Sequence, residues 1–184
     1  MFSLIFGLGN PGPEYRGTRH NVGLMVLETV ARRQKLSWRP ERWGPAYVAE
    51  GQQALFISPL CYMNESGVVV RKFLQRLRKK PEDILVIVDD IALPLDKLRL
   101  RPGGASGGHR GLLSVATAIG SEAFARLRCG IGPLPRSVDL ADFVLARFCE
   151  DERPVLESMI ERAADAFECC QECGIEVAMS RFNA

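Results

Sequence analysis

The 184-residue chain lacks the long apolar run that a membrane span requires. A transmembrane helix needs about 20 consecutive apolar residues, and the apolar stretch near the N-terminus covers only residues 2–8. This stretch has neither a basic flank before it nor a small-residue cleavage site after it, so it predicts a buried strand instead of a signal peptide. We therefore expect a cytoplasmic protein that has no membrane partner.

The usual ligands of a structural zinc ion, histidines and C-x-x-C cysteine pairs, are also scarce. The only histidines are His20 and His109, and the six cysteines do not supply two C-x-x-C pairs. A structural zinc site needs four such ligands. A chain of this length buries enough apolar surface to fold without disulfides. The sequence therefore predicts free thiols, no bound metal and no other cofactor.

The distribution of apolar residues predicts one α/β domain. Uninterrupted apolar runs at 2–8 and 84–88 are typical of central strands that are covered on both faces. Because strands alternate with helical segments, we predict a single three-layer domain over residues 1–184, with a mixed, mainly parallel twisted sheet and helices on both faces. The other expected strands are 46–58 (a hairpin), 98–101 and 127–131, and the expected helices are 20–35, 66–80 (capped by Asn64 or Ser66), 109–119 and 150–173.

Polar side chains follow two of the buried strands. Asn10 comes after the strand at 2–8, and Asp89 comes directly after the strand at 84–88. Ligands of open α/β sheets bind beyond the carboxyl ends of the strands. We therefore expect both side chains to lie on the same rim of the sheet.

The first glycine-rich segment allows a dinucleotide-binding interpretation, because residues 7–12 match G-x-G-x-x-G after a strand. That fold requires a helix that opens at the glycines and an acidic residue at the end of the second strand. Here Pro11 and Pro13 bracket the turn, the helix is delayed to about residue 20, and Glu28 lies within that helix. The surrounding sequence disfavours this interpretation.

The second glycine-rich segment allows a serine hydrolase interpretation, because residues 104–108 match G-x-S-x-G with Ser106 as the nucleophile. That elbow requires a histidine later in the chain. The only later one, His109, belongs to the same loop. The alternative is a loop whose glycines allow flexibility or close approach to a phosphate.

A third interpretation starts from His20 and Asn21, which stand at the beginning of an otherwise apolar helix, and from Asp89. A histidine beside a carboxylate is held in one tautomer and becomes a better base near pH 7. Such a pair activates water without a nucleophilic side chain or a metal. Spacing alone leaves a structural role for His20 equally open.

The motifs around these residues resemble those of the bacterial-type peptidyl-tRNA hydrolase family. Residues 7–12, Tyr15 and the segment 18–23 (TRHNVG) are similar to the opening signature of that family. Further similar motifs follow in the family's order, so the resemblance covers essentially the whole chain. They are residues 62–67 (YMNESG), 88–94 (VDDIALP), 107–112 (GGHRGL), 128–132 (RCGIG) and 180–183 (SRFN).

The resemblance implies a function and a catalytic group. The family hydrolyses the ester between a peptide and the terminal ribose of tRNA, which recycles tRNA from stalled or aborted translation. It implies that His20 is the general base, that Asp89 orients it and stabilises its charged form, and that Asn10 helps to distinguish a blocked peptide from a free amino group. It also implies a monomer whose partner is peptidyl-tRNA.

The resemblance implies a peptide subsite as well. Tyr62 and Asn64 are expected to hold the peptide main chain, and Met63 to shape the pocket. Tyr15 is expected beside the terminal nucleotide or the peptide. Asparagine suits a peptide backbone because its amide both donates and accepts hydrogen bonds.

Basic residues cluster although the net charge is only +2. We interpret the run in residues 71–80 as a solvated helix face. In a second group, the resemblance assigns Arg101, His109 and Arg128 to the acceptor end of the tRNA and its terminal phosphate. Arginine suits bidentate contacts with phosphate, and such binding weakens steeply with salt.

Two positions depart from the family pattern. Arg110 replaces an asparagine that contacts substrate, and Val88 replaces a common histidine. A guanidinium cannot accept a hydrogen bond, so Arg110 is expected to bind substrate differently. This departure favours the alternative of a non-catalytic RNA-binding relative that acts in RNA processing. The retained His20, Asp89, Asn10 and Asn64 favour the enzyme.

Overall fold

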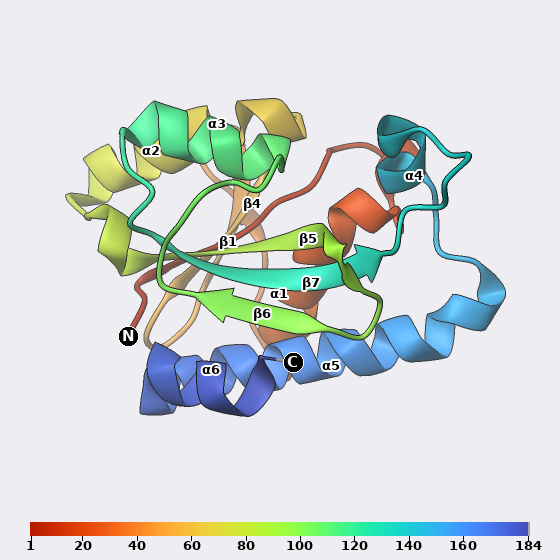
Figure 1. The fold of residues 1–184 in the computed structure, drawn as a ribbon. Helices are drawn as coiled ribbons and strands as arrows, with labels where there is room; N and C mark the ends of the chain where they lie inside the picture. The colour runs from red at the N-terminus through yellow and green to blue at the C-terminus, as the bar shows by residue number, and fades with distance from the viewer. Residues whose placement is uncertain (184) are drawn as a thin grey trace.

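The computed structural model describes residues 1–183. Its centre is a seven-stranded sheet in the order β2-β3-β4-β1-β5-β7-β6. Helices α2 and α3 cover one face, while α1, α5 and α6 cover the other (Figure 1). The strands are β1 (Leu4–Gly7), β2 (Arg39–Pro40), β3 (Ala46–Glu50), β4 (Leu55–Pro59), β5 (Ile84–Pro94), β6 (Leu98–Arg101) and β7 (Ala125–Gly132). The helices are α1 (Val22–Arg33), α2 (Ser66–Leu77), α3 (Arg110–Ile119), α4 (Leu140–Leu145), α5 (Arg153–Cys173) and α6 (Ile175–Phe182), and the 3-10 turns are η1 (Pro13–Tyr15), η2 (Arg19–Asn21), η3 (Met63–Glu65), η4 (Pro81–Asp83) and η5 (Glu150–Glu152).

The four central strands are parallel, which confirms the predicted mixed three-layer α/β fold. Strand β1 pairs with β4 on one side and with β5 on the other, and β5 pairs with β7. The outer pairs β2–β3, β3–β4 and β6–β7 are antiparallel. All four residues of β1 are buried, as expected for a strand that is covered on both faces.

Two apolar layers hold the helices to the sheet. On one face, α1 and α5 pack through side chains such as Val26 and Phe167. On the other face, α2 packs through Val70 and Phe73, and α3 through Val115. Within residues 1–183, no helix is both long and apolar enough to cross a membrane.

Three local features differ from the prediction. Strand β5 continues to Pro94, so Asp89 lies within the strand and not beyond its end. No side chain caps α2, because the hydroxyl of Ser66 donates to the carbonyl of Met63 instead. The short elements β2, α4 and α6 were not predicted, since they span few residues and carry little periodicity.

A close approach between α2 and α3 generates a stability prediction. A Cβ at Gly67 would overlap the backbone carbonyl of Ser114 and lie 2.7 Å from the Cβ of Ala118. Overpacking of this kind costs roughly 1–3 kcal/mol. We expect Gly67→Ala to lower the free energy of unfolding by about that amount in chemical denaturation. Gly44→Ala is the control, because its Cβ would meet only the Lys72 side chain, at 3.7 Å, and equal stability of the two variants would contradict the prediction.

Candidate active site

A pocket of about 540 Å³ opens at the carboxyl ends of the central strands. Residues after β1, residues of β5, the start of α3 and one side of α4 form its walls. Every residue that the sequence predicts for the site lines this pocket except Tyr15 and Arg101. Asn10 and Asp89 share it, as the rim argument predicted.

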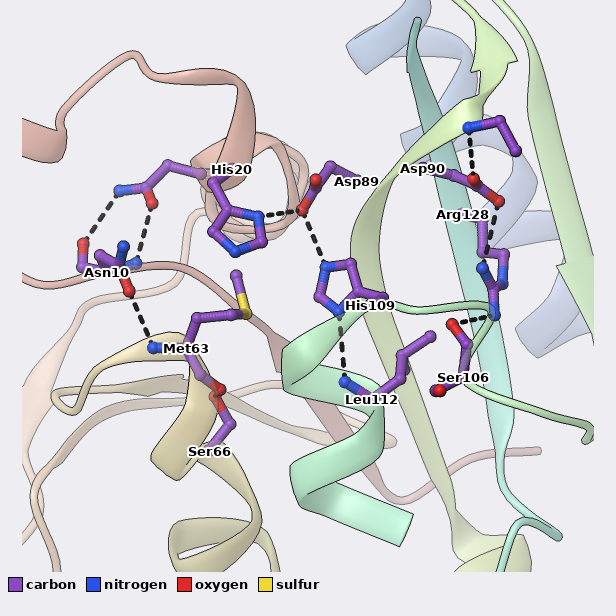
Figure 2. A network of polar contacts seen from close by, with 12 residues as sticks. Asn10, His20, Met63, Ser66, Asp89, Asp90, Ser106, His109, Leu112 and Arg128 are labelled. Carbon is purple, nitrogen blue, oxygen red and sulfur yellow. Dashed lines mark hydrogen bonds and ion pairs between the residues drawn. The ribbon is translucent and has the colours of Figure 1, made fainter. Parts of the chain in front are cut away.

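The carboxylate of Asp89 is the centre of the polar network in this pocket (Figure 2). Its Oδ1 accepts a hydrogen bond from His20 Nδ1 at 2.8 Å and another from His109 Nε2 at 2.9 Å. Asp89 is only 2% exposed. Burial by itself would raise its pKa, but the charge and the hydrogen bonds of the two imidazoles outweigh burial and hold the pKa of Asp89 well below its usual range.

The network assigns opposite tautomers to the two imidazoles. His109 Nδ1 accepts a hydrogen bond from the backbone N–H of Leu112 at 3.2 Å, so the proton of His109 lies on Nε2 and points at Asp89. His20 places Nδ1 against the same carboxylate, which puts its proton on Nδ1. In the neutral imidazole, Nε2 of His20 is therefore the nitrogen without a proton, and within residues 1–183 it has no hydrogen-bond partner. This is the arrangement of a general base with an orienting carboxylate.

Asn10 is held in one orientation by its neighbours. Its backbone N–H donates to Asn21 Oδ1 at 2.8 Å, and Asn21 Nδ2 donates to the carbonyl of Asn10 at 3.0 Å. Asn10 Oδ1 accepts from the backbone N–H of Met63 at 2.8 Å. Because Oδ1 is occupied, the side chain offers its NH2 group to the pocket. The positioning contribution of Asn21 was not predicted, and its only signal in the sequence is a polar residue at the start of an apolar helix.

The residues predicted for a peptide subsite differ in exposure. Met63 is buried at 4% exposure, whereas Tyr62 is 52% exposed and Asn64 is also exposed. Tyr15 lies outside the pocket lining, but its ring packs edge to face on Tyr62 with centroids 6.3 Å apart. A Cβ at position 111 would lie 2.5 Å from the sulfur of Met63, so any larger residue there would force the Met63 side chain to move.

The loop at residues 102–108 is anchored to β7 by two arginines. Arg126 is 1% exposed and donates to backbone carbonyls of the loop, at Gly104 and Ala105, and of the segment before β7, at Glu122 and Phe124. Burial lowers the pKa of Arg126 to about 10. The carbonyl side of the loop is therefore fixed against the sheet.

Arg128 anchors the same loop from the pocket side. Its guanidinium donates to Asp90 Oδ2 at 3.2 Å and to the carbonyl of Ser106 at 3.0 Å (Figure 2), and also to the carbonyl of Ala105 at 2.9 Å. Ser106 thus contributes its carbonyl, and no hydrogen bond joins its hydroxyl to an imidazole in the described part of the chain. This arrangement gives no support to Ser106 as a nucleophile.

Of the three residues predicted for the tRNA acceptor end, His109 and Arg128 line the pocket and Arg101 does not. The His109 side chain is 7% exposed and is turned towards Asp89. The Arg128 side chain is 11% exposed and lines the pocket. Arg101 is exposed on β6, opposite Arg126, and lies outside the pocket lining. Arg110 is exposed at the start of α3 and does line the pocket.

His20, Asp89 and His109 are also the residues that could hold a metal, since their donor atoms lie within 4.8 Å of one another. Two ligands of one tetrahedral zinc ion, with bonds of about 2.0–2.1 Å, would stand roughly 3.3 Å apart. The nitrogen–oxygen distances of 2.8 and 2.9 Å are shorter than that and match hydrogen bonds. The spacing favours shared protons over a shared metal.

Arg19, the residue before His20, fixes α4 against the turn that carries the imidazole. Its Nη2 donates to both carboxylate oxygens of Glu152, at 2.8 and 2.7 Å. The guanidinium carbon lies 4.4 Å from the ring centroid of Phe143 in α4 and 4.6 Å from that of Phe148. The backbone N–H of Arg19 donates to the carbonyl of Ala146 at 2.9 Å. One wall of the pocket and the candidate base are thus held together by one buried side chain.

Comparisons with known proteins identify the family of this chain. A family profile described as peptidyl-tRNA hydrolase matches residues 4–184. A peptidyl-tRNA hydrolase of Methylacidiphilum infernorum is 47% identical over 184 residues, which cover 100% of this chain and 99% of the relative. One from Fervidobacterium nodosum is 42% identical, with 98% of this chain and 96% of the relative covered. The crystal structure of peptidyl-tRNA hydrolase from Acinetobacter baumannii superposes with a TM-score of 0.93 at 31% identity, covering 100% of this chain and 95% of that chain.

The Arg19–Glu152 ion pair generates a pH-dependent stability prediction. Burial alone would raise the pKa of Glu152, but hydrogen bonds from Arg19 and Cys149 outweigh it, so the pKa lies below its ordinary value. A carboxyl group whose pKa is lower in the folded state stabilises the fold above its unfolded pKa of about 4.3, and this contribution is lost as the pH falls. We expect Glu152→Gln to be less stable than wild type by roughly 1–3 kcal/mol at pH 7, and the difference to shrink below about pH 4.

Chemical denaturation at pH 7 and at low pH measures this difference. Glu150→Gln is the matched control, because Glu150 lies in the same turn and is exposed, and the described residues give it no ion pair. The prediction would be contradicted if Glu152→Gln lowered the free energy of unfolding by the same amount at both pH values.

Proposed function

Since this chain belongs to the peptidyl-tRNA hydrolase family, we propose that it hydrolyses the ester between peptide and tRNA, with His20 as the general base. The family is the one that the sequence motifs predicted. The observation that carries the assignment of the base is the His20–Asp89 hydrogen bond of 2.8 Å, which leaves His20 Nε2 unprotonated at the pocket.

The proposed reaction begins when His20 Nε2 takes a proton from a water molecule. The water oxygen attacks the ester carbonyl carbon and gives a tetrahedral intermediate. The imidazolium returns its proton to the ribose oxygen as the ester bond breaks. The products are tRNA and the carboxylic acid of the peptide, which loses its proton to solvent. Asp89 stabilises the imidazolium and keeps Nδ1 as the protonated nitrogen. An ester is activated enough for one base and a few amide donors to suffice.

Asn10 is proposed to discriminate between blocked and free substrates. Its Oδ1 is occupied by the Met63 N–H, so it presents two N–H donors. A donor pairs with the carbonyl oxygen of a blocked, amide-linked residue. A free ammonium group has only donors, so it finds no partner at Asn10.

The remaining predicted residues are proposed to bind the substrate. Tyr62, Met63 and Asn64 surround the expected peptide, and the Tyr15 ring extends the Tyr62 surface. Arg110 is an exposed cation at the mouth of the pocket, which suits a phosphate more than a peptide carbonyl. Arg101, His109 and Arg128 remain proposed contacts of the acceptor end.

We also propose that the protein acts as a cytoplasmic monomer that recycles tRNA, with no metal or other cofactor. The alternative, a non-catalytic RNA-binding relative in RNA processing, is favoured only by Arg110 in place of the family's asparagine. The His20–Asp89 hydrogen bond is present alongside both Arg110 and Val88. The intact pair therefore supports the enzyme.

Removal of the base is the direct test of catalysis. We expect His20→Ala to lower kcat for an N-blocked aminoacyl-tRNA by roughly 10²–10⁴-fold, the usual contribution of general base catalysis. Release of the amino acid from labelled substrate, in the presence of a chelator, gives the rate. Ser106→Ala is the control and should keep the wild-type rate. Hydrolysis that is independent of His20 would favour the RNA-binding alternative.

Substrate discrimination tests Asn10. In Asn10→Asp, one oxygen still accepts from Met63, and the other places an acceptor where the NH2 group was. We expect the ratio of kcat/KM for N-acetylated over free aminoacyl-tRNA to fall by about 10-fold or more, because loss of one hydrogen bond and gain of an unfavourable contact amount to about 1–3 kcal/mol. A ratio equal to that of wild type would remove Asn10 from this role.

A further inference from the structure

The exposed face of α2 and its C-terminal extension carries a dense positive charge. Residues 66–80 include six basic residues and no aspartate or glutamate. All six side chains are exposed. The opposite face of α2 is apolar and buried against the sheet. We call the six residues the α2 basic face; they are Arg71, Lys72, Arg76, Arg78, Lys79 and Lys80.

Several basic side chains elsewhere on this protein are paired with carboxylates, unlike those of the α2 basic face. Arg33 on α1 pairs with three carboxylates of α5. Arg32, Arg39 and Arg162 also have carboxylate partners. Within residues 1–183, no ion pair joins the α2 basic face to a carboxylate, and the nearby Asp83 carboxylate is engaged by the backbone N–H of Lys80. The α2 basic face is therefore a surface of uncompensated charge.

Helix stability explains only part of this pattern. Cations near the C-terminus of a helix interact favourably with its dipole, and this accounts for residues such as Arg76 and Arg78. Arg71 and Lys72 lie more than a turn further from that end. Lys72 and Arg76 are also four residues apart, where like charges destabilise a helix. The charge is better explained by an anionic partner that lies along the helix.

We propose that the α2 basic face binds the phosphate backbone of the substrate's tRNA, away from its acceptor end; this inference rests on the proposed function. Helix α2 follows η3, which carries Asn64 at the pocket, and leads away from the pocket towards the far end of the sheet (Figure 1). At 1.5 Å per residue, Arg71 lies about 10 Å and Arg76 about 18 Å beyond Asn64 along the chain. An RNA whose end enters the pocket can extend along this row.

An anionic membrane is the competing partner, and the structure disfavours it. Peripheral helices bind membranes by inserting an apolar face between the headgroups. Val69, Val70 and Phe73 on the apolar face of α2 are each at most 2% exposed, because they belong to the core layer between this helix and the sheet. The α2 basic face can therefore attract a partner only through its charge. The phosphate groups along an RNA strand supply a linear row of negative charge that matches a helix face.

The test compares two triple variants with the same change in net charge. The first is Arg71→Gln, Lys72→Gln and Arg76→Gln, which removes half of the α2 basic face. The control is Arg32→Gln, Arg39→Gln and Arg162→Gln, which removes three cations that have carboxylate partners. Each variant is assayed with two substrates. Both are N-acetylated aminoacyl esters, one of full-length tRNA and the other of a short oligonucleotide that ends in CCA. Circular dichroism verifies that both variants fold.

We expect the α2 triple variant to raise KM for the full-length tRNA by roughly 10-fold or more at low salt, as expected for the loss of several phosphate contacts. Its kcat should be unchanged, and its KM for the short substrate should equal that of wild type. The dependence of KM on salt should become shallower. The control triple should retain both KM values.

Three results would overturn the proposal. The first is an unchanged KM of the α2 triple variant for full-length tRNA. The second is an equal rise of this KM in both triple variants. The third is an equal rise of the KM of the α2 triple variant for both substrates. Fluorescence anisotropy with deacylated tRNA measures the surface without catalysis. If wild type binds this tRNA more tightly than the α2 triple variant but hydrolyses neither ester, the proposed function is refuted. The proposal that the α2 basic face binds tRNA would still hold. Binding of wild type to phosphatidylserine vesicles, lost in the α2 triple without a change in tRNA affinity, would assign the surface to membranes instead.

Discussion

The carboxylate of Asp89 is the group on which the arrangement of the pocket depends. It is buried on β5, yet two imidazoles donate to the same oxygen at 2.8 and 2.9 Å. The charge and the hydrogen bonds of the two imidazoles outweigh burial and hold the pKa of Asp89 well below its usual range. In return, the carboxylate fixes the tautomer of His20 and directs its free nitrogen to the pocket. The other nitrogen of His109 accepts from the Leu112 N–H, so His109 is itself fixed and also restrains the carboxylate.

The surrounding structure positions the elements that carry these groups. Asn21 and the Met63 backbone hold Asn10 next to the base. Arg126 and Arg128 attach the loop before α3 to β7 through its carbonyls. Each contact crosses between segments that are distant in sequence, so the pocket depends on correct packing of the whole sheet. This explains why polar contacts of the site are buried although the pocket itself is open to substrate.

Much of the fold was predictable from the sequence, because its signals are local. The apolar runs of β1 and β5 and the alternation in β6 predicted the strands, and the rim argument correctly brought Asn10 and Asp89 together. Motif resemblance identified the family, whereas spacing alone left His20 open. The bond between His109 and Asp89 was not predictable, because it depends on the path of the glycine-rich loop. The packing of Arg19 between two aromatic rings depends on α4, which is too short to give a periodic signal.

The assignment of opposite tautomers to the two imidazoles is the central claim, and nitrogen NMR tests it most directly. The chain has only two histidines, so spectra of the ¹⁵N-labelled protein above about pH 8 resolve four ring nitrogens, which a His109→Gln variant assigns. We predict that the proton of His20 lies on Nδ1 and that of His109 on Nε2. A His20 ring protonated on Nε2 would contradict this account, because that nitrogen could not then accept a proton from water.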